Sequence, residues 1–144
     1  MTITRAVYSE IERSVGSQPP ETGGWLGGSR GSTTITRFSF DRRADWTARS
    51  MSPRIEDLPR ILASEWRGDA HSLLGFVHSH PKHARSPSRS DIQFIGLVMN
   101  IVATDRLYLP IATVDGGFEL FSFVVARAHR NDLTLERCEL RVVD

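Results

Sequence analysis

The chain has 144 residues, a hydrophobic fraction of 40%, a charged fraction of 24% and a formal net charge of +1. This length and composition predict one globular domain, residues 1–144, that buries about 70% of its unfolded surface on folding. The near-neutral charge argues against a strongly basic surface for nucleic acid, and the single cysteine excludes an intramolecular disulfide and a cysteine-based zinc cluster.

The N-terminal segment and the lengths of the apolar runs bear on location. Residues 1–15 carry charges every few positions, which is not the pattern of a signal peptide. No segment approaches about 20 uninterrupted apolar residues, so we expect no membrane-spanning helix. With the single cysteine, these features predict a cytoplasmic protein that binds neither membrane nor nucleic acid.

The first third of the chain predicts a helix followed by two strands. Apolar side chains recur every four residues from Ile3 to Val15, which is the stripe of an amphipathic helix. Residues 21–29, "ETGGWLGGS", indicate a glycine-rich strand whose backbone lies close to another segment. Residues 33–40 are rich in β-branched and aromatic side chains and are expected to pair with 21–29 as a hairpin.

The next segment predicts a loop and a second helix. Residues 41–53 show no clear period, so we expect an exposed loop there. A helix is expected at about 54–67, where apolar residues gather on one side. Pro59 fits this helix only if it lies in the first turn, because proline has no N–H to donate.

The remaining elements alternate strand and helix. Residues 72–80 form a nearly continuous apolar run, typical of a central strand, and 91–103 are apolar on most faces, typical of a buried helix. Residues 106–114 and 118–125, joined by "DGG", predict a hairpin. A last strand is expected within 133–143, which completes an alternating α/β pattern.

Two histidines stand at the end of the predicted central strand. His78 and His80 point to the same face, because side chains at i and i+2 share a face of a strand. Pro81 ends the strand because proline has no N–H for the sheet. Asp91 stands at the start of the following helix, and a compact loop between them would bring its carboxylate close to the two histidines. Two histidines and one aspartate suit a Zn²⁺ ion whose fourth position is left to water.

Each of these residues also has a plain structural explanation. A His-x-His pair occurs in strands without a metal, and Ser88 or Ser90 followed by Asp91 can be a helix N-cap alone. Hydrolysis at a zinc site needs a proton acceptor that is not a ligand, and Glu21, at the start of the strand 21–29, could supply it. A glutamate at a strand end can equally be solvated. On the residues alone, both interpretations stay open.

The combined pattern resembles a known family. "ETGGWLGG", then "GFVHSHP", then Ser88 seven residues and Asp91 ten residues after Pro81, are similar to the glutamate, H-x-H-P and S-x-x-D elements of JAMM/MPN+ (JAB) zinc metalloproteases. Every element is present and in order. The resemblance covers about Thr4 to Val125 and is nearest to the prokaryotic JAB branch.

The resemblance implies a fold and a role for each residue of the pattern. The fold would be a cytidine-deaminase-like α/β/α sandwich with a mixed central sheet. His78, His80 and Asp91 would bind Zn²⁺. Glu21 would take a proton from the attacking water and later give it to the leaving amine. Ser88 would form a hydrogen bond with the zinc-bound water or with the developing oxyanion.

The resemblance also implies an activity. Such enzymes commonly hydrolyse the peptide or isopeptide bond after the C-terminal Gly-Gly of a ubiquitin-like protein, as deconjugation or as precursor processing. In bacteria, relatives are linked to ubiquitin-like modification systems with activating and conjugating enzymes, some of them antiphage. The alternative is processing of a sulfur-carrier protein. The substrate tail would add a strand beside the sheet, with a clamp expected in 41–53.

Other classes of protein share parts of the pattern. A non-catalytic JAB-fold scaffold usually lacks the ligands, whereas all are present here. A RadC-type relative has the same spacing, but its usual motif is His-Asn-His-Pro and the basic surface expected for DNA is missing. A zinc deaminase needs H-x-E and P-C-x-x-C, which a single cysteine cannot supply. Cys138 as a nucleophile lacks an assigned histidine partner.

Overall fold

The computed structural model describes residues 1–41, 45–46, 51–52, 58–60, 63, 66, 71–129 and 132–144. The helices are α1 (Arg5–Ser14), α2 (Leu58–Arg60) and α3 (Arg89–Ile101). The strands are β1 (Thr2–Thr4), β2 (Gly23–Ser29), β3 (Thr34–Ile35), β4 (Arg37–Phe40), β5 (Asp45–Trp46), β6 (Met51–Ser52), β7 (His71–Pro81), β8 (Arg106–Tyr108), β9 (Ile111–Val114), β10 (Glu119–Phe121), β11 (Phe123–Arg127), β12 (Leu133–Arg137) and β13 (Arg141–Val143).

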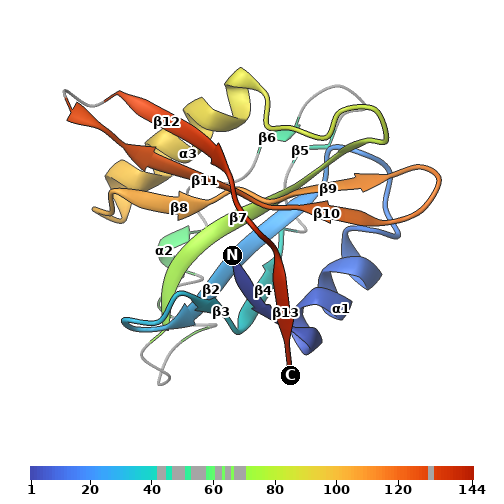
Figure 1. Cartoon of the computed structure of the whole chain (residues 1–144), viewed down its shortest axis with the longest axis horizontal. Coiled ribbons are helices and arrows are strands. Elements are labelled where there is room, and N and C mark those ends of the chain that lie inside the picture. Colours follow the sequence, from blue (N-terminus) through green and yellow to red (C-terminus); the bar gives the residue numbers. More distant parts are fainter. Residues whose placement is uncertain are drawn as a thin grey trace.

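The long strand β7 lies at the centre of a mixed sheet of eight strands (Figure 1). On one side β7 pairs antiparallel with β2, which pairs antiparallel with β4. On the other side β8 and β9 lie end to end and run parallel to β7. The parallel pairing requires a crossover, which α3 provides between β7 and β8. This arrangement confirms the α/β class with a mixed sheet.

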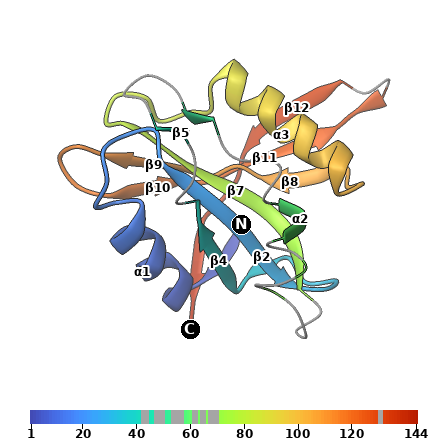
Figure 2. The same cartoon turned by 180° about the vertical axis from the view of Figure 1, so that it is seen from behind.

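Two helices cover opposite faces of this sheet. Along β7, alternate side chains enter different apolar clusters: Val77 packs in the cluster that includes α1, and Phe76 packs in the cluster that includes α3. Figure 2, which views the molecule from behind, brings α3 in front of β11 and β12. Since His78 follows Phe76 by two residues, its side chain lies on the α3 face. Ser79 follows Val77 and lies on the α1 face.

Several predicted elements are confirmed, and some boundaries differ. The glycine-rich strand is β2, and it pairs with β4 as expected. Its glycines are needed for close packing: a Cβ at Gly23 would collide with the carbonyl oxygen of Val77 in β7. The predicted hairpin of 106–114 and 118–125 is present, but Leu109–Pro110 divides its first strand and Ser122 divides its second.

The three-stranded sheet of β13, β1 and β3 was not predicted. Ile3 lies in β1 rather than in the first helix, which begins at Arg5 with Thr4 as its N-cap. The predicted last strand is divided into two strands. β12 pairs antiparallel with β11 up to Arg137, and β13 pairs parallel with β1 from Arg141. These pairings join distant parts of the chain, so local periodicity does not reveal them.

The region 41–67 is described only in part. Within the predicted loop 41–53, β5 and β6 form a short antiparallel pair. Strands of two residues are too short to produce a recognisable alternation. Of the predicted helix 54–67, α2 is observed at Leu58–Arg60 with Pro59 inside it, and the side chains of Leu58 and Trp66 are buried. Apart from residues 63 and 66, the rest of that predicted helix lies outside the described residues.

Candidate metal centre

The two histidines lie side by side at the C-terminal end of β7. Both side chains point to the α3 face, as the alternation of a strand predicts, and their ring centroids are 4.7 Å apart. His78 and His80 are each 5% exposed. Buried imidazoles need partners for both ring nitrogens, so their surroundings show what the site can hold.

Asp91 lies against both histidines. Its Oδ1 is 2.8 Å from Nδ1 of His78, and its Oδ2 is 3.1 Å from Nε2 of His80. The position of the carboxylate is set by the start of α3, where Ser88 and Asp91 form a capping box. In this box the backbone N–H of Ser88 donates to Oδ2 of Asp91 at 2.6 Å. The predicted proximity of Asp91 to the histidine pair is therefore present.

The tautomer of His80 follows from its backbone contact. Nδ1 of His80 lies 3.0 Å from the carbonyl oxygen of Ala84. A carbonyl oxygen only accepts, so Nδ1 carries the proton that is donated to it. In the neutral ring, the lone pair of Nε2 then faces Oδ2 of Asp91, which is also an acceptor. Two facing acceptors are satisfied by a proton or a metal cation between them.

Glu21 approaches His78 from the other side of the pair. Its Oε2 is 2.9 Å from Nε2 of His78, which is the distance of an ion pair. In the described part of the chain, Nε2 of His78 is buried with no partner other than this carboxylate. A buried imidazole nitrogen that faces a carboxylate oxygen is satisfied by a proton or by a metal cation between them.

The backbone at Glu21 has an unusual conformation. Its φ of 73° lies in the left-handed region, which costs a non-glycine residue about 1 kcal/mol or more. The sequence predicted a strand that starts at Glu21. In the structure β2 starts at Gly23, so Glu21 precedes the strand. Its N–H donates to the carbonyl oxygen of Ser79 at 3.0 Å. This contact links Glu21 to Ser79, the residue between the two histidines. The sequence pattern assigns no role to Ser79.

The charges in the cluster shift its pKa values. Burial lowers the pKa of His78, but hydrogen bonds with Asp91 and Glu21 and the negative charges of both carboxylates outweigh burial and raise the pKa to about 9. Burial raises the pKa of Asp91, but hydrogen bonds with the two histidines, the charge of His78 and the N–H of Ser88 hold it well below its usual range. In the metal-free protein, His78 is thus a cation at neutral pH beside ionised Asp91.

The donor set fits a zinc ion. Glu21, His78 and His80 each offer one ligand atom within 4.8 Å of the others. Asp91 adds a second carboxylate in contact with both rings. Imidazole nitrogens and carboxylate oxygens are ligands that Zn²⁺ takes in catalytic sites.

Ser88 lies at the N-cap of α3 and is exposed. Its hydroxyl oxygen accepts the N–H of Asp91 at 3.2 Å and lies 3.0 Å from the hydroxyl of Ser90. The capping explanation for Ser88 is therefore correct. Its predicted role toward an oxyanion stays a prediction.

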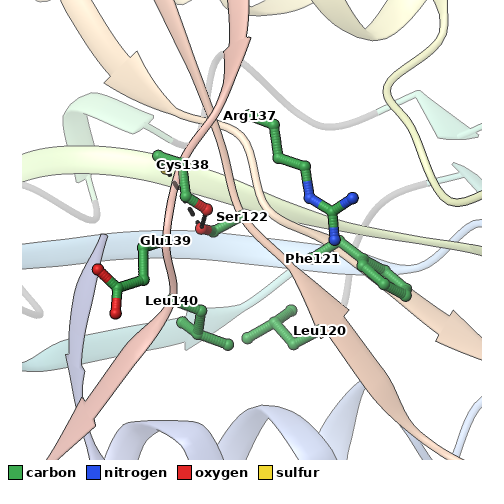
Figure 3. Close-up of a pocket in the computed structure, with 7 residues that line it drawn as sticks. All are labelled: Leu120, Phe121, Ser122, Arg137, Cys138, Glu139 and Leu140. Atoms are coloured by element: carbon green, nitrogen blue, oxygen red, sulfur yellow. Dashed lines mark hydrogen bonds between the residues drawn. The ribbon is translucent and has the colours of Figure 1, made fainter.

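His83, His129 and Cys138 lie apart from the cluster. His83 and His129 are exposed, and neither belongs to a group of potential metal ligands within the described ranges. The Sγ atom of Cys138 lies 3.2 Å from the Oγ atom of Ser122. Both residues line a hollow of about 380 Å³ between β10 and the segment that leads to β13 (Figure 3). This hollow shares no residue with the histidine cluster.

Comparison with known proteins relates this arrangement to a family. Residues 4–137 match the model of a family described as prokaryotic homologs of the JAB domain. No curated protein matches the chain. In the described part of the chain, no helix is long and apolar enough to cross a membrane.

Two solved structures share the fold. The solution structure of a protein from Desulfitobacterium hafniense is similar with a TM-score of 0.67 and 20% identity, and the match covers 98% of this chain and 91% of that one. The crystal structure of a JAB1/MPN domain protein from Archaeoglobus fulgidus is similar with a TM-score of 0.53 and 19% identity, covering 99% of this chain and 97% of that one.

Proposed function

Because this chain belongs to the family of prokaryotic homologs of the JAB domain, we propose that it is a zinc-dependent peptidase or isopeptidase. The observation that carries the proposal is the buried histidine pair with a carboxylate on either side. In this proposal His78, His80 and Asp91 hold the metal. Asp91 is chosen over Glu21 as the third ligand because it contacts both rings, whereas Glu21 contacts His78.

The metal and the protein have separate tasks in this reaction. Zn²⁺, when bound, polarises the scissile carbonyl and lowers the pKa of a water molecule. Glu21 acts as the general base: its carboxylate takes a proton from the attacking water as the water oxygen bonds to the carbonyl carbon. When the carbon–nitrogen bond breaks, Glu21 gives this proton to the leaving amine. The burial of Glu21 and its position beside His78 support this role.

Ser88 is proposed to stabilise the oxyanion. Its oxygen is held by the N–H of Asp91, so its O–H is free to point to Ser90 or to a substrate oxygen. As the N-cap of α3, it stands where the helix dipole favours negative charge.

The proposed substrate is the C-terminal Gly-Gly tail of a ubiquitin-like protein. A tail of small residues in extended conformation can add to the edge of a sheet and bring its last carbonyl to a buried site without side-chain obstruction. Activating and conjugating enzymes of a ubiquitin-like modification system are the partners this substrate implies.

Cleavage of a defined fusion tests the proposal. A ubiquitin-like protein encoded beside this chain would be fused through its Gly-Gly terminus to a short peptide and read by intact mass. Zinc-loaded enzyme should cut after Gly-Gly, while chelator-treated enzyme and Glu21→Gln should leave the fusion intact. An unfolded peptide with the same junction is the matched control. Cleavage that resists the chelator would refute the proposed dependence on zinc. Equal rates on the fusion and on the unfolded control would refute the proposed substrate class.

A further inference from the structure

We propose that Ser79, the residue between the two histidines, is a positioning residue that holds Glu21 in place together with Thr22. The inference rests on the proposed role of Glu21 as the general base. Ser79 is fully buried and lies on the opposite face of β7 from the histidine side chains. It therefore cannot touch a substrate or a metal, and it acts through the residues it contacts.

Four hydrogen bonds join Ser79 to the segment that carries Glu21. The N–H of Glu21 donates to the carbonyl oxygen of Ser79 at 3.0 Å, and the N–H of Ser79 donates to the carbonyl oxygen of Thr22 at 2.7 Å. The N–H of Thr22 donates to Oγ of Ser79 at 2.9 Å, and the two hydroxyl oxygens are 3.1 Å apart. Two of these bonds need the Ser79 hydroxyl. Glu21, Thr22 and Ser79 form what we call the serine clamp.

The serine clamp acts where regular strand pairing has ended. The last pair of β2 and β7 is Gly23 with His78, so neither Glu21 nor Thr22 is held by that ladder. Glu21 also has a left-handed backbone, which would relax toward an extended conformation without a restraint. Thr22 is 4% exposed, so loss of the Ser79 hydroxyl would leave its N–H and its own hydroxyl buried without these partners.

The geometry connects the base to the proposed ligands through one residue. His78 and His80 project from one face of β7, and Ser79 between them grips the Glu21 segment on the other. The relative position of Glu21 and the histidines is thus set over three consecutive residues of a central strand. Displacement of a reacting group by about 1 Å costs on the order of 100-fold in rate, so the clamp should affect turnover more than binding.

A matched pair of variants at Thr22 separates positioning from stability. Thr22→Val removes the hydroxyl and keeps the shape, whereas Thr22→Ser keeps the hydroxyl and removes a methyl group. Both should retain zinc. We expect kcat on the Gly-Gly fusion to fall about 10- to 100-fold for Thr22→Val and Ser79→Ala with little change in KM, and to stay near wild type for Thr22→Ser. If Thr22→Val and Ser79→Ala keep the wild-type kcat, the clamp has no positioning role.

A double variant tests whether Ser79 acts through Glu21. Adding Ser79→Ala to Glu21→Gln should cause no further loss, because the base is already absent. A further loss equal to that of Ser79→Ala alone would overturn the inference. Wild-type activity of Glu21→Gln itself would instead refute the proposed function, so the two failures are distinguishable.

Amide hydrogen exchange gives a readout that needs no substrate. In Ser79→Ala, the amide of Thr22 should exchange at least about tenfold faster, because its acceptor is lost. The amide of His78 donates to the carbonyl oxygen of Pro110 at 3.1 Å and serves as the internal control, with unchanged protection. Unchanged exchange at Thr22 would show that the hydroxyl does not hold this segment, and would overturn the inference.

Discussion

Two carboxylates flank the same histidine pair, and the chain holds them in different ways. Asp91 is fixed by a capping box with Ser88, three residues away in the sequence. Glu21 is fixed by Ser79, 58 positions further along the chain, and has a left-handed backbone. The first arrangement obeys the local rules of a helix start, while the second depends on the assembled sheet.

This difference separates metal binding from catalysis. The proposed ligands His78, His80 and Asp91 lie on one strand and the next helix, so their geometry persists wherever β7 and α3 pack together. The proposed base comes from the segment before β2 and is held under strain. A change on the Glu21 side should therefore reduce turnover while zinc stays bound, and a change on the Asp91 side should remove both.

The largest effect is expected from Asp91→Ala. The change removes a proposed ligand and leaves Nδ1 of His78 without its acceptor. Loss of a residue that only supports a ligand lowers metal affinity about 10- to 100-fold, so zinc affinity should fall by more than this. Metal analysis after gel filtration should find about one zinc per wild-type chain and much less in the variant. His83→Ala, a change at an exposed histidine outside the cluster, is the control and should keep its zinc. Full zinc in Asp91→Ala would remove Asp91 from the ligand set.

Glu21→Gln should show the opposite behaviour. It keeps the shape of the side chain and removes the proton acceptor, so turnover should fall by about 10²- to 10⁴-fold. Zinc content and the unfolding midpoint should stay near wild type, because Glu21 is not a proposed ligand. Loss of zinc in Glu21→Gln would mean that Glu21 coordinates the metal, as its proximity to both histidines also allows.

A smaller effect is expected from Ser88→Ala. Loss of the N-cap should lower the free energy of unfolding by about 0.5–2 kcal/mol, measured by urea denaturation of the metal-free protein. Ser88→Asn keeps a capping oxygen and should lose less stability. If Ser88 also stabilises the oxyanion, both variants should lose kcat. Equal stability of Ser88→Ala and wild type would contradict the capping role seen at α3.

The smallest effect is a pH dependence of the metal-free protein. Because the pKa of His78 is raised from 6.5 to about 9, the stability that it contributes is complete below about pH 6.5 and is lost as the pH rises through about 9. The lowered pKa of Asp91 acts in the other direction: its contribution is present above about pH 4 and is lost as the pH falls further.

Urea unfolding of chelator-treated protein at pH 6 and pH 9 measures this dependence. Wild type should lose more unfolding free energy over this range than His78→Gln, which cannot ionise. An equal loss in both proteins would show that His78 does not carry the effect.

The Asp91 side of the site could be predicted from the sequence because its determinants are local. A period of two residues places His78 and His80 on one face, and the distance from Pro81 to Asp91 allows a short loop into a capped helix. The same reasoning located β7, α3 and the hairpin of β2 and β4. Each depends on patterns within one element or two neighbouring elements.

Glu21 was predicted as the candidate proton acceptor, but the way in which it is held could not be predicted because its determinants are non-local. Neither the left-handed backbone of Glu21 nor its link to Ser79 leaves a signal in the residues around it. The same holds for β1 and β13, which pair from opposite ends of the chain. Ser79 could have been found by asking what the inner face of the His-x-His strand must satisfy, since a buried hydroxyl requires a partner.

The left-handed backbone at Glu21 also bears on how such a domain evolves. Glycine adopts this conformation without penalty, so Glu21→Gly should relieve about 1 kcal/mol of strain while removing the proposed base. Selection for stability and selection for turnover therefore oppose each other at this position. A descendant freed from catalysis would drift toward glycine here while keeping its fold and its histidines. Glutamate at position 21 therefore stands against the local preference of the backbone, and the proposed chemistry is the reason to keep it there.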